Sequence, residues 1–563
     1  MDRHEGAGST VERHWSRTAT WWLLPMLALA VHGPSLSGAW VYDDWNNFDR
    51  NQALRTGDWV GLVTRPYYGH DTTYWRPVTS LLMAVGYLAG PLGMHAIAIA
   101  LHVLTAGVLA SIGRRLLGDP RLALCAALLF TLHPLQVESV AWASALPSVP
   151  CALFTLLTVR SVSIWSTGEG DRPPWPAAAW LLGALLSKEA GVAAVPLVIA
   201  IVFGAGCSRP RMARLAVSGL AILLAVLWFA LHVAMAGYRP VLGDDAAWVA
   251  GTAHMWFGQI ALLLVPWPLT PFRAHPSEIG GPLIDLAVVL ALIACIAFAC
   301  ARWRRLAQRW QIAGALTALP LLLAAVTHAA VGPHPLTDRY MYGSLGGFAL
   351  LVAALIGRRF VLLGALVLAY GGMTVAQVRV WQDDRAFVSH VCRHSPNDAS
   401  VHVLAGNLAL QSGDAAGRTT ARREFETALG LWSERTDDFA ERQRAAAIAG
   451  LAWCDFTDPA RAAATLGPSL IERFRRAVNH HRRYVPAWVG LGVALNLNAR
   501  FDEARMAFET ALALDPMCPE AWFNLGRLQL DLGQCDAACE SFRAAVRCKP
   551  DLEVAHELLA RLR

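Results

Sequence analysis

The chain has 563 residues, of which 55% are hydrophobic and only 16% charged, and its mean hydropathy is +0.38. This composition excludes a soluble single-domain protein, because such a domain needs a more polar surface and is rarely this long. The formal net charge of +6 is spread over short loops, and no block rich in Lys and Arg is interleaved with aromatic residues. We therefore expect no nucleic-acid partner.

Apolar runs separated by short polar loops continue to about residue 376, after which the sequence is polar. This pattern predicts an all-α protein with a cytoplasmic N-terminal tail at 1–19, a polytopic helical membrane domain at 20–376 and a soluble domain at 377–563. The first apolar run contains Pro34 and lacks a clear small-x-small cleavage site. We therefore interpret it as an uncleaved anchor.

Arginine clusters set the predicted topology, because basic residues concentrate in cytoplasmic loops. If all six clusters lie inside, the chain crosses the membrane about eleven times and the C-terminal domain lies outside. The six clusters are Arg13/Arg17, Arg114/Arg115/Arg121, Arg160/Arg172, Arg209/Arg211/Arg214, Arg302/Arg304/Arg305/Arg309 and Arg358/Arg359. The predicted crossings are 20–39, 93–113, 121–140, 146–164, 175–188, 190–206, 214–236, 283–301, 311–328, 343–357 and 360–376. Two further apolar segments, 78–88 and 255–266, are too short to cross and predict interfacial or re-entrant helices, so ten to thirteen crossings stay open.

Only two of the 48 basic residues are lysine, a bias typical of GC-rich bacterial genomes. Together with the predicted topology, this bias indicates a multi-pass protein of a bacterial inner membrane whose C-terminal domain is periplasmic. The outer loops are then 40–92, 237–282 and 328–342. Charged residues gather in these loops and at the outer helix ends, which predicts a polar cavity that opens in the outer leaflet.

A 34-residue repeat marks the end of the chain. Seven residues of one unit recur 34 residues later in the next. The first unit has Trp488, Leu491, Gly492, Ala504, Phe508, Ala511 and Pro516, and the second has Trp522, Leu525, Gly526, Ala538, Phe542, Ala545 and Pro550. This is the tetratricopeptide pattern, with clear repeats at 485–518 and 519–552. Gly406, Ala421, Phe425 and Ala428 indicate a degenerate earlier unit, and 439–484 predicts a divergent helical pair. Such an α-solenoid forms a groove that binds peptides or proteins.

The membrane part carries an ordered set of short motifs that resembles the transmembrane and tetratricopeptide-repeat O-mannosyltransferases. The matching stretches are Tyr42-Asp43-Asp44, Tyr74-Trp75-Arg76-Pro77, His133-Pro134-Leu135 with Glu138 and Trp142, Leu186-Ser187-Lys188-Glu189-Ala190-Gly191, and Asp338-Arg339-Tyr340-Met341-Tyr342. The resemblance implies a class C membrane glycosyltransferase that uses a polyprenyl-phosphate sugar. The chain departs from the family at 143–148, which reads Ala-Ser-Ala-Leu-Pro-Ser where the family often has a Gly-Arg-(Lys)-Asp stretch.

Transfer of a sugar to a hydroxyl requires a base for the acceptor proton and positive charge for the departing phosphate. The resemblance assigns the base to the Asp43/Asp44 pair, without a choice between the two. Alternatively, Asp43 caps a short helix at Trp45 while Asp44 is solvated. The main interpretation contains no metal site. A third interpretation is a divalent cation bound by Asp43 and Asp44. Because such an ion needs more ligands than two side chains supply, Glu138 or Glu189 would complete its coordination.

Arg339 and Arg76 are candidates for binding the donor phosphate, because a guanidinium forms two hydrogen bonds with phosphate oxygens. Lys188 and His133 are further candidates, and Glu138, Glu189 and Tyr340 are secondary members of the site. Structural roles remain open for four of them. These are a membrane-interface anchor for Arg76, an ion pair between Arg339 and Asp338, an ion pair between Lys188 and Glu189, and a helix-end role for His133 beside Pro134.

The sequence thus predicts a membrane enzyme that transfers a sugar, mannose by family resemblance, from a lipid-linked donor to a protein hydroxyl with inversion. Its expected partners are the polyprenyl-phosphate sugar, membrane lipid and a protein or peptide held in the tetratricopeptide groove. One alternative is a non-enzymatic, membrane-anchored scaffold for envelope assembly. Another is an enzyme like the O-antigen ligases or polymerases, although the late outer loop at 328–342 is short for that class.

Overall fold

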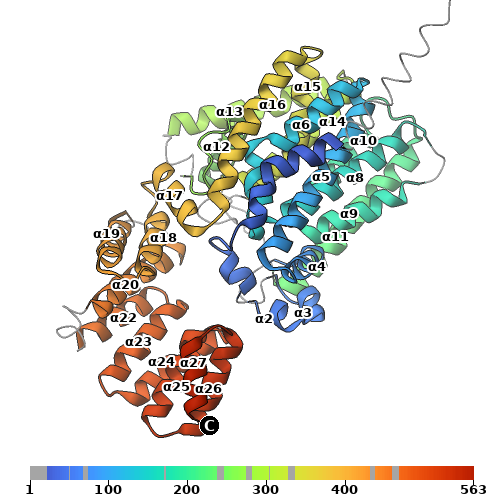
Figure 1. Ribbon diagram of the computed structural model, residues 1–563. Coiled ribbons are helices and arrows are strands. Elements are labelled where there is room, and N and C mark those ends of the chain that lie inside the picture. The colour runs from blue at the N-terminus through green and yellow to red at the C-terminus, as the bar shows by residue number, and fades with distance from the viewer. Residues whose placement is uncertain are drawn as a thin grey trace, which may run out of the picture. The chain divides into compact units, whose positions relative to one another are not determined.

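Two compact units make up the protein, one ending at Phe387 and the other beginning at Val388 (Figure 1). The computed structural model describes residues 22–49, 51–67, 74–169, 173–237, 246–273, 282–303, 305–327, 336–431, 438–458 and 468–562. Within these ranges the regular secondary structure is helical and no strand occurs. This confirms the predicted all-α fold with a tetratricopeptide-repeat solenoid.

The first unit is a bundle of apolar helices connected by short polar segments. After the apolar helix Trp22–Ser37, it contains η2 (Trp45–Asp49), α2 (Gln52–Thr56), α3 (Trp59–Thr64), α4 (Pro77–Tyr87), α5 (Gly90–Leu117), α6 (Pro120–Leu132), η3 (Pro134–Gln136), α7 (Val137–Ala141), η4 (Ala143–Ala145), α8 (Ser148–Ser166), α9 (Trp175–Ser187), η5 (Glu189–Ala193), α10 (Ala194–Val202), α11 (Arg211–Ala236), α12 (Ala246–Leu264), α13 (Pro282–Trp303), α14 (Gln308–Val326), η8 (Asp338–Tyr340), α15 (Tyr342–Ile356), α16 (Phe360–Val378) and η9 (Arg379–Trp381).

Six of the described helices are long and apolar enough to cross a membrane, and a seventh crossing results if the bent pair of α6 with η3 and α7 counts as one. These seven coincide with predicted crossings. The other four predicted crossings coincide with shorter apolar helices: Trp22–Ser37, Trp175–Ser187, Glu189–Val202 and Tyr342–Ile356. The total of eleven crossings therefore stays a prediction.

The two segments predicted to be too short to cross differ in length. α4 has 11 residues, as expected, whereas α12 has 19 residues and is longer than the dozen predicted. Two helix breaks separate neighbouring apolar segments. Pro134 follows α6, and Lys188 adopts an extended conformation between α9 and η5. These breaks place polar side chains at interrupted helix ends.

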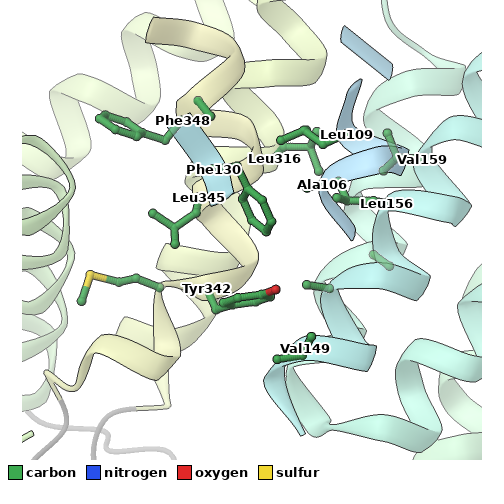
Figure 2. Close-up of a cluster of buried hydrophobic side chains, with 14 of the residues drawn as sticks. Ala106, Leu109, Phe130, Val149, Leu156, Val159, Leu316, Tyr342, Leu345 and Phe348 are labelled. Carbon is green, nitrogen blue, oxygen red and sulfur yellow. The ribbon is translucent and has the colours of Figure 1, made fainter. Parts of the chain in front are cut away.

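The core of the first unit is packed from facing helices, as Figure 2 shows for side chains of α5, α6, α8, α14 and α15. Phe130 and Tyr342 lie edge to face with ring centroids 5.5 Å apart. The Tyr342 hydroxyl is 2.7 Å from Nδ1 of the buried His102, which satisfies a polar group that burial would otherwise leave unpaired. Since lipid is as apolar as these side chains, close packing and such hydrogen bonds hold the helices together.

The second unit consists of consecutive helix pairs. These are α18 (Ala399–Leu410) with α19 (Ala415–Leu431), α20 (Asp438–Thr457) with α22 (Pro468–His480), α23 (Val485–Leu497) with α24 (Phe501–Leu514), and α25 (Pro519–Asp531) with α26 (Cys535–Cys548), followed by α27 (Glu553–Arg561). α17 (Asp384–His394) lies at the boundary between the units. The degenerate and divergent pairs predicted before the clear repeats are therefore present as helices.

In each clear repeat, a phenylalanine of the second helix packs on a glycine of the first helix. A Cβ atom on Gly492 would lie 2.5 Å from the Phe508 ring, and one on Gly526 would lie 2.8 Å from the Phe542 ring. Such distances are too short for a real side chain, so only glycine allows the two helices of a repeat to approach this closely. This explains why these glycine and phenylalanine positions recur at the 34-residue spacing.

Candidate active site

Asp44 is a buried carboxylate that fastens the first polar loop to η4. Its Oδ1 accepts hydrogen bonds from the backbone N–H of Ser144, at 2.8 Å, and from the Ser144 hydroxyl, while Oδ2 accepts from the N–H of Val41 at 3.2 Å. Asp44 is only 1% exposed. Burial raises the pKa of its carboxyl to about 7, although the hydrogen bonds oppose the rise. Asp44 is thus held in place by the protein rather than solvated.

Asp43 precedes this anchor and is half-buried. Its backbone carbonyl accepts the N–H groups of Asn46 and Asn47, at 3.1 and 2.9 Å, so its position at the start of η2 is fixed. The side chain is more accessible than that of Asp44. The two adjacent carboxylates therefore differ in environment, which the sequence alone did not reveal.

Tyr42 has a left-handed backbone conformation, with φ of +57°. This conformation is unfavourable for a residue with a Cβ and is retained only when surrounding contacts impose it. The Tyr42 N–H donates to Asp384 at 2.9 Å, and the Trp45 indole donates to the same carboxylate at 3.0 Å. The Tyr42 ring packs against Trp142, with centroids 5.9 Å apart. Strain next to the double aspartate indicates that the direction of these carboxylates is determined by the fold.

Arg339 is paired with Glu138 rather than with its neighbour Asp338. Its Nη1 lies 2.5 Å from Oε1 of Glu138, which is only 1% exposed. The guanidinium lies over the rings of Trp142 and Tyr340, with centroid distances of 5.2 and 4.9 Å. Asp338 is instead 2.7 Å from Arg273. Arg339 remains partly exposed, at 23%, so its guanidinium is reachable.

Arg76 forms a two-pronged pair with Glu189. Its Nε and Nη2 lie 3.0 and 2.6 Å from the two carboxylate oxygens. The guanidinium also lies over the Tyr74 ring, 4.3 Å from its centroid. Arg76 is therefore built into the protein, and not merely an anchor beside Trp75 at the membrane surface.

Lys188 lies next to these pairs and contacts a different element. Its Nζ donates to the Ser148 hydroxyl at 2.8 Å and lies 5.2 Å from the centroid of the Tyr340 ring. The Ser148 hydroxyl in turn lies 3.3 Å from the backbone carbonyl of Arg339. Tyr340 is thus shared by Lys188 and Arg339, which brings two of the predicted phosphate ligands together.

The predicted site residues fall into one connected group, with one exception. The segment 142–148 connects the parts, because Ser144 binds Asp44, Trp142 lies under Arg339, and Ser148 binds Lys188. The exception is His133, whose Nδ1 accepts the N–H of Leu135 at 3.3 Å and whose Nε2 is 3.2 Å from the carbonyl of Leu263. These contacts favour the structural interpretation of His133 that the sequence left open.

Several contributors were not identified from the sequence. Ser144 and Ser148 lie in the stretch where the chain departs from the family pattern, and that departure was the available signal. Asp384 and Arg273 gave no local signal, because each acts on residues far away in the chain. Within the described ranges, no group of three His, Cys, Asp or Glu side chains is arranged to hold a metal ion. The oxygens of Asp44 accept N–H and O–H groups, which a cation would have to displace.

The helical bundle and the solenoid define a membrane protein with a tetratricopeptide-repeat domain. Residues 497–553 match the tetratricopeptide repeat family. The chain is similar to protein O-mannosyl-transferase TMTC4 of Homo sapiens, with 32% identity over 202 residues, and to protein O-mannosyl-transferase TMTC2 of the same organism, with 28% identity over 184 residues. These matches confirm the resemblance indicated by the motifs.

Each of these two matches covers 30% of this chain and spans only 27% of TMTC4 and 22% of TMTC2. Among solved structures, a thermophilic tetratricopeptide protein of Thermus thermophilus is similar at 18% identity, over 35% of this chain and 94% of that protein, with a TM-score of 0.26.

Proposed function

We propose that this protein is a glycosyltransferase that moves a sugar, mannose by its resemblance to the O-mannosyl-transferases, from a polyprenyl-phosphate carrier to a hydroxyl of a protein acceptor. The observation that carries the proposal is the convergence of Arg76, Lys188 and Arg339 around Tyr74 and Tyr340. Arg76 and Arg339 stay charged beside their carboxylate partners, Glu189 and Glu138, and Lys188 adds a third basic group that a bound phosphate would hold in its charged form. That charge suits a lipid-linked phosphate.

Asp43 is the proposed base. A base must reach the acceptor hydroxyl, and Asp43 is more exposed than Asp44. The three hydrogen bonds to Asp44 make it the residue that positions the loop, and Ser144 is the side chain that holds it. In this proposal the Asp43/Asp44 pair acts without a divalent metal.

The reaction is a single displacement. The acceptor oxygen attacks the anomeric carbon while the bond between that carbon and the phosphate oxygen breaks, and the bonding electrons leave with the phosphate. Asp43 takes the acceptor proton, and the positive cluster stabilises the charge that accumulates on the departing phosphate. Because attack and departure occur on opposite faces, the anomeric configuration is inverted.

Glu138 and Glu189 have a supporting part in this proposal. Each holds one guanidinium in a fixed direction, so that little conformational entropy is lost when phosphate binds. Arg339 is partly exposed, and Lys188 supplies a compact ammonium between the two pairs. We place the protein in a bacterial inner membrane, with the solenoid in the periplasm, where it would recruit the polypeptide acceptor.

The test is transfer of radiolabelled mannose from polyprenyl-phosphate mannose to periplasmic protein by the purified full-length chain. Wild type should label protein, and Asp43→Asn should not, while its elution in size-exclusion chromatography stays unchanged. Transfer that persists in Asp43→Asn would move the base elsewhere. If wild type transfers no sugar from any polyprenyl phosphate to an acceptor extract that a control enzyme can modify, the scaffold interpretation replaces the enzyme.

A further inference from the structure

An apolar cavity lies between α8, α9, α10 and α11, at some distance from the charged cluster. Its volume is about 300 Å³, at the lower end of the range found for small-molecule sites. Val162, Leu181, Val198, Ala221 and Leu224 are among the residues that line it. The one hydroxyl in the lining, that of Thr158, donates to the Phe154 carbonyl of its own helix at 2.8 Å. The walls therefore suit a hydrocarbon and offer little to a polar ligand.

The cavity shares two helices with the charged cluster. α8 begins at Ser148, which binds Lys188, and reaches the cavity at Thr158 and Val162, ten and fourteen residues later. At 1.5 Å per residue these positions are about 15 and 21 Å along the helix. α9 ends next to Lys188 and lines the cavity with Leu181, seven residues or about 10 Å earlier. Both helices therefore lead from the cations to the cavity.

These distances restrict the lipid that could join the two places. One leaflet of a bilayer is about 15 Å thick, so the cavity begins in the same leaflet as Lys188, about 10 Å away along α9, and extends past the midplane, to about 21 Å along α8. A lipid whose phosphate lies at Lys188 must therefore cross the midplane to fill the cavity. A polyprenyl chain is long enough for this, whereas the acyl chain of an outer-leaflet phospholipid ends at about that depth. The positive cluster supplies the matching attraction for the phosphate.

We propose that the cavity between α8, α9, α10 and α11 binds the polyprenyl tail of the donor, so that the enzyme selects its donor by tail length. This inference rests on the proposed function for its headgroup site. It adds a second contact that is independent of the sugar. A short-tailed donor would fill the charged cluster alone, and a long-tailed donor would fill both.

The experiment compares two donors that carry the same sugar and phosphate, one with a geranyl tail and one with an undecaprenyl tail. The variant Ala178→Leu/Ala221→Leu fills the cavity, since both alanines line it. Ala179→Leu is the matched control, because this neighbour does not line the cavity. We expect the filled variant to lose about tenfold in kcat/KM with the undecaprenyl donor and to be unchanged with the geranyl donor. The control should match wild type with both.

An equal loss with both donors, or no loss with either, would overturn the proposal. Binding of radiolabelled undecaprenyl phosphate to the full-length protein gives a second measurement that needs no sugar transfer. Wild type and Ala179→Leu should bind it at least tenfold more tightly than geranyl phosphate, and the filled variant should lose this preference. If binding shows the preference but no donor supports transfer, the proposed function fails and the lipid site stands. A co-purifying phospholipid that undecaprenyl phosphate does not displace from wild type would assign the cavity to bilayer lipid and overturn the proposal.

Discussion

Asp44 and Ser144 are joined by two hydrogen bonds although a hundred residues of chain separate them. The Ser144 hydroxyl also accepts from the Asn47 amide at 2.9 Å, so one serine holds both the residue before η2 and the middle residue of η2. Four residues further on, Ser148 binds Lys188. The short segment 142–148 therefore fixes the acidic loop and the basic cluster relative to each other. Loss of either serine would alter geometry on both sides of the proposed reaction centre.

The two aspartates should respond differently to the same substitution. Asp43→Asn should abolish transfer and leave the thermal stability within about 0.5 kcal/mol of wild type, because a partly exposed residue is changed. Asp44→Asn should destabilise the protein by about 1–3 kcal/mol at pH 6, because the amide NH₂ group would face either the Ser144 donors or the Val41 donor, and that donor would lose its acceptor. Thermal unfolding in detergent and the transfer assay separate the two effects. Equal stability of both variants would contradict the positioning role of Asp44.

The stability deficit of Asp44→Asn should shrink as the pH rises. The folded-state pKa of Asp44 is raised from 3.8 to about 7 by burial, so between about pH 4 and pH 7 the folded protein binds more protons than the unfolded chain. Wild type therefore loses stability through this window, by up to about 4 kcal/mol, whereas the asparagine cannot titrate. Melting temperatures of both proteins at pH 5, 6, 7 and 8 measure this. A difference that stays constant across the series would show that Asp44 does not titrate in this range.

Much of the fold could be predicted from the sequence, because its determinants are local or periodic. Apolar runs gave the position of α8, predicted at 146–164 and found at Ser148–Ser166, since a membrane helix needs a continuous apolar stretch. The repeats could be aligned because Gly492 and Phe508 must meet within one repeat, and the next repeat has the same requirement. The extended conformation of Lys188 between α9 and η5 was not predicted, since it follows from packing against Ser148 and Tyr340.

The sequence indicated the charged residues that the structure brings together, but it did not predict their ion pairs. The sequence offered adjacent partners, Lys188 with Glu189 and Asp338 with Arg339. The structure pairs Glu189 with Arg76, 113 residues away, and Arg339 with Glu138, 201 residues away. These pairs depend on which helix ends meet, and a single sequence carries no direct signal of that contact.

Arg273→Ala should be among the single substitutions that destabilise the first unit most. Arg273 and Asp338 form a buried pair with side chains 9% and 3% exposed, and Arg273 also donates to the Leu336 carbonyl at 2.9 Å. Arg273→Ala leaves a buried carboxylate without its partner, which typically costs about 3–5 kcal/mol. The double variant Arg273→Ala/Asp338→Ala should recover part of this loss, because no unpaired charge remains. Thermal unfolding of the three variants gives the comparison, and a double variant less stable than Arg273→Ala would argue against charge burial as the cause.

Replacement of Ala499 by glycine should stabilise the first clear repeat, because the second clear repeat has a glycine at the same position of the same turn. Ala499 has φ of +57°, and Gly533, 34 residues later, has φ of +74°. The turns share their hydrogen bonds as well, from Ala499 to Asn496 and from Gly533 to Leu530. A left-handed conformation costs a residue with a Cβ about 1–2 kcal/mol, so Ala499→Gly should stabilise its repeat by about 1 kcal/mol and Gly533→Ala should destabilise the next by a similar amount.

Hydrogen exchange of the full-length protein should then be about fivefold slower in α23 and α24 of the first variant and about fivefold faster in α25 and α26 of the second. Faster exchange in Ala499→Gly would mean that the gain in unfolded-state entropy exceeds the relief of strain.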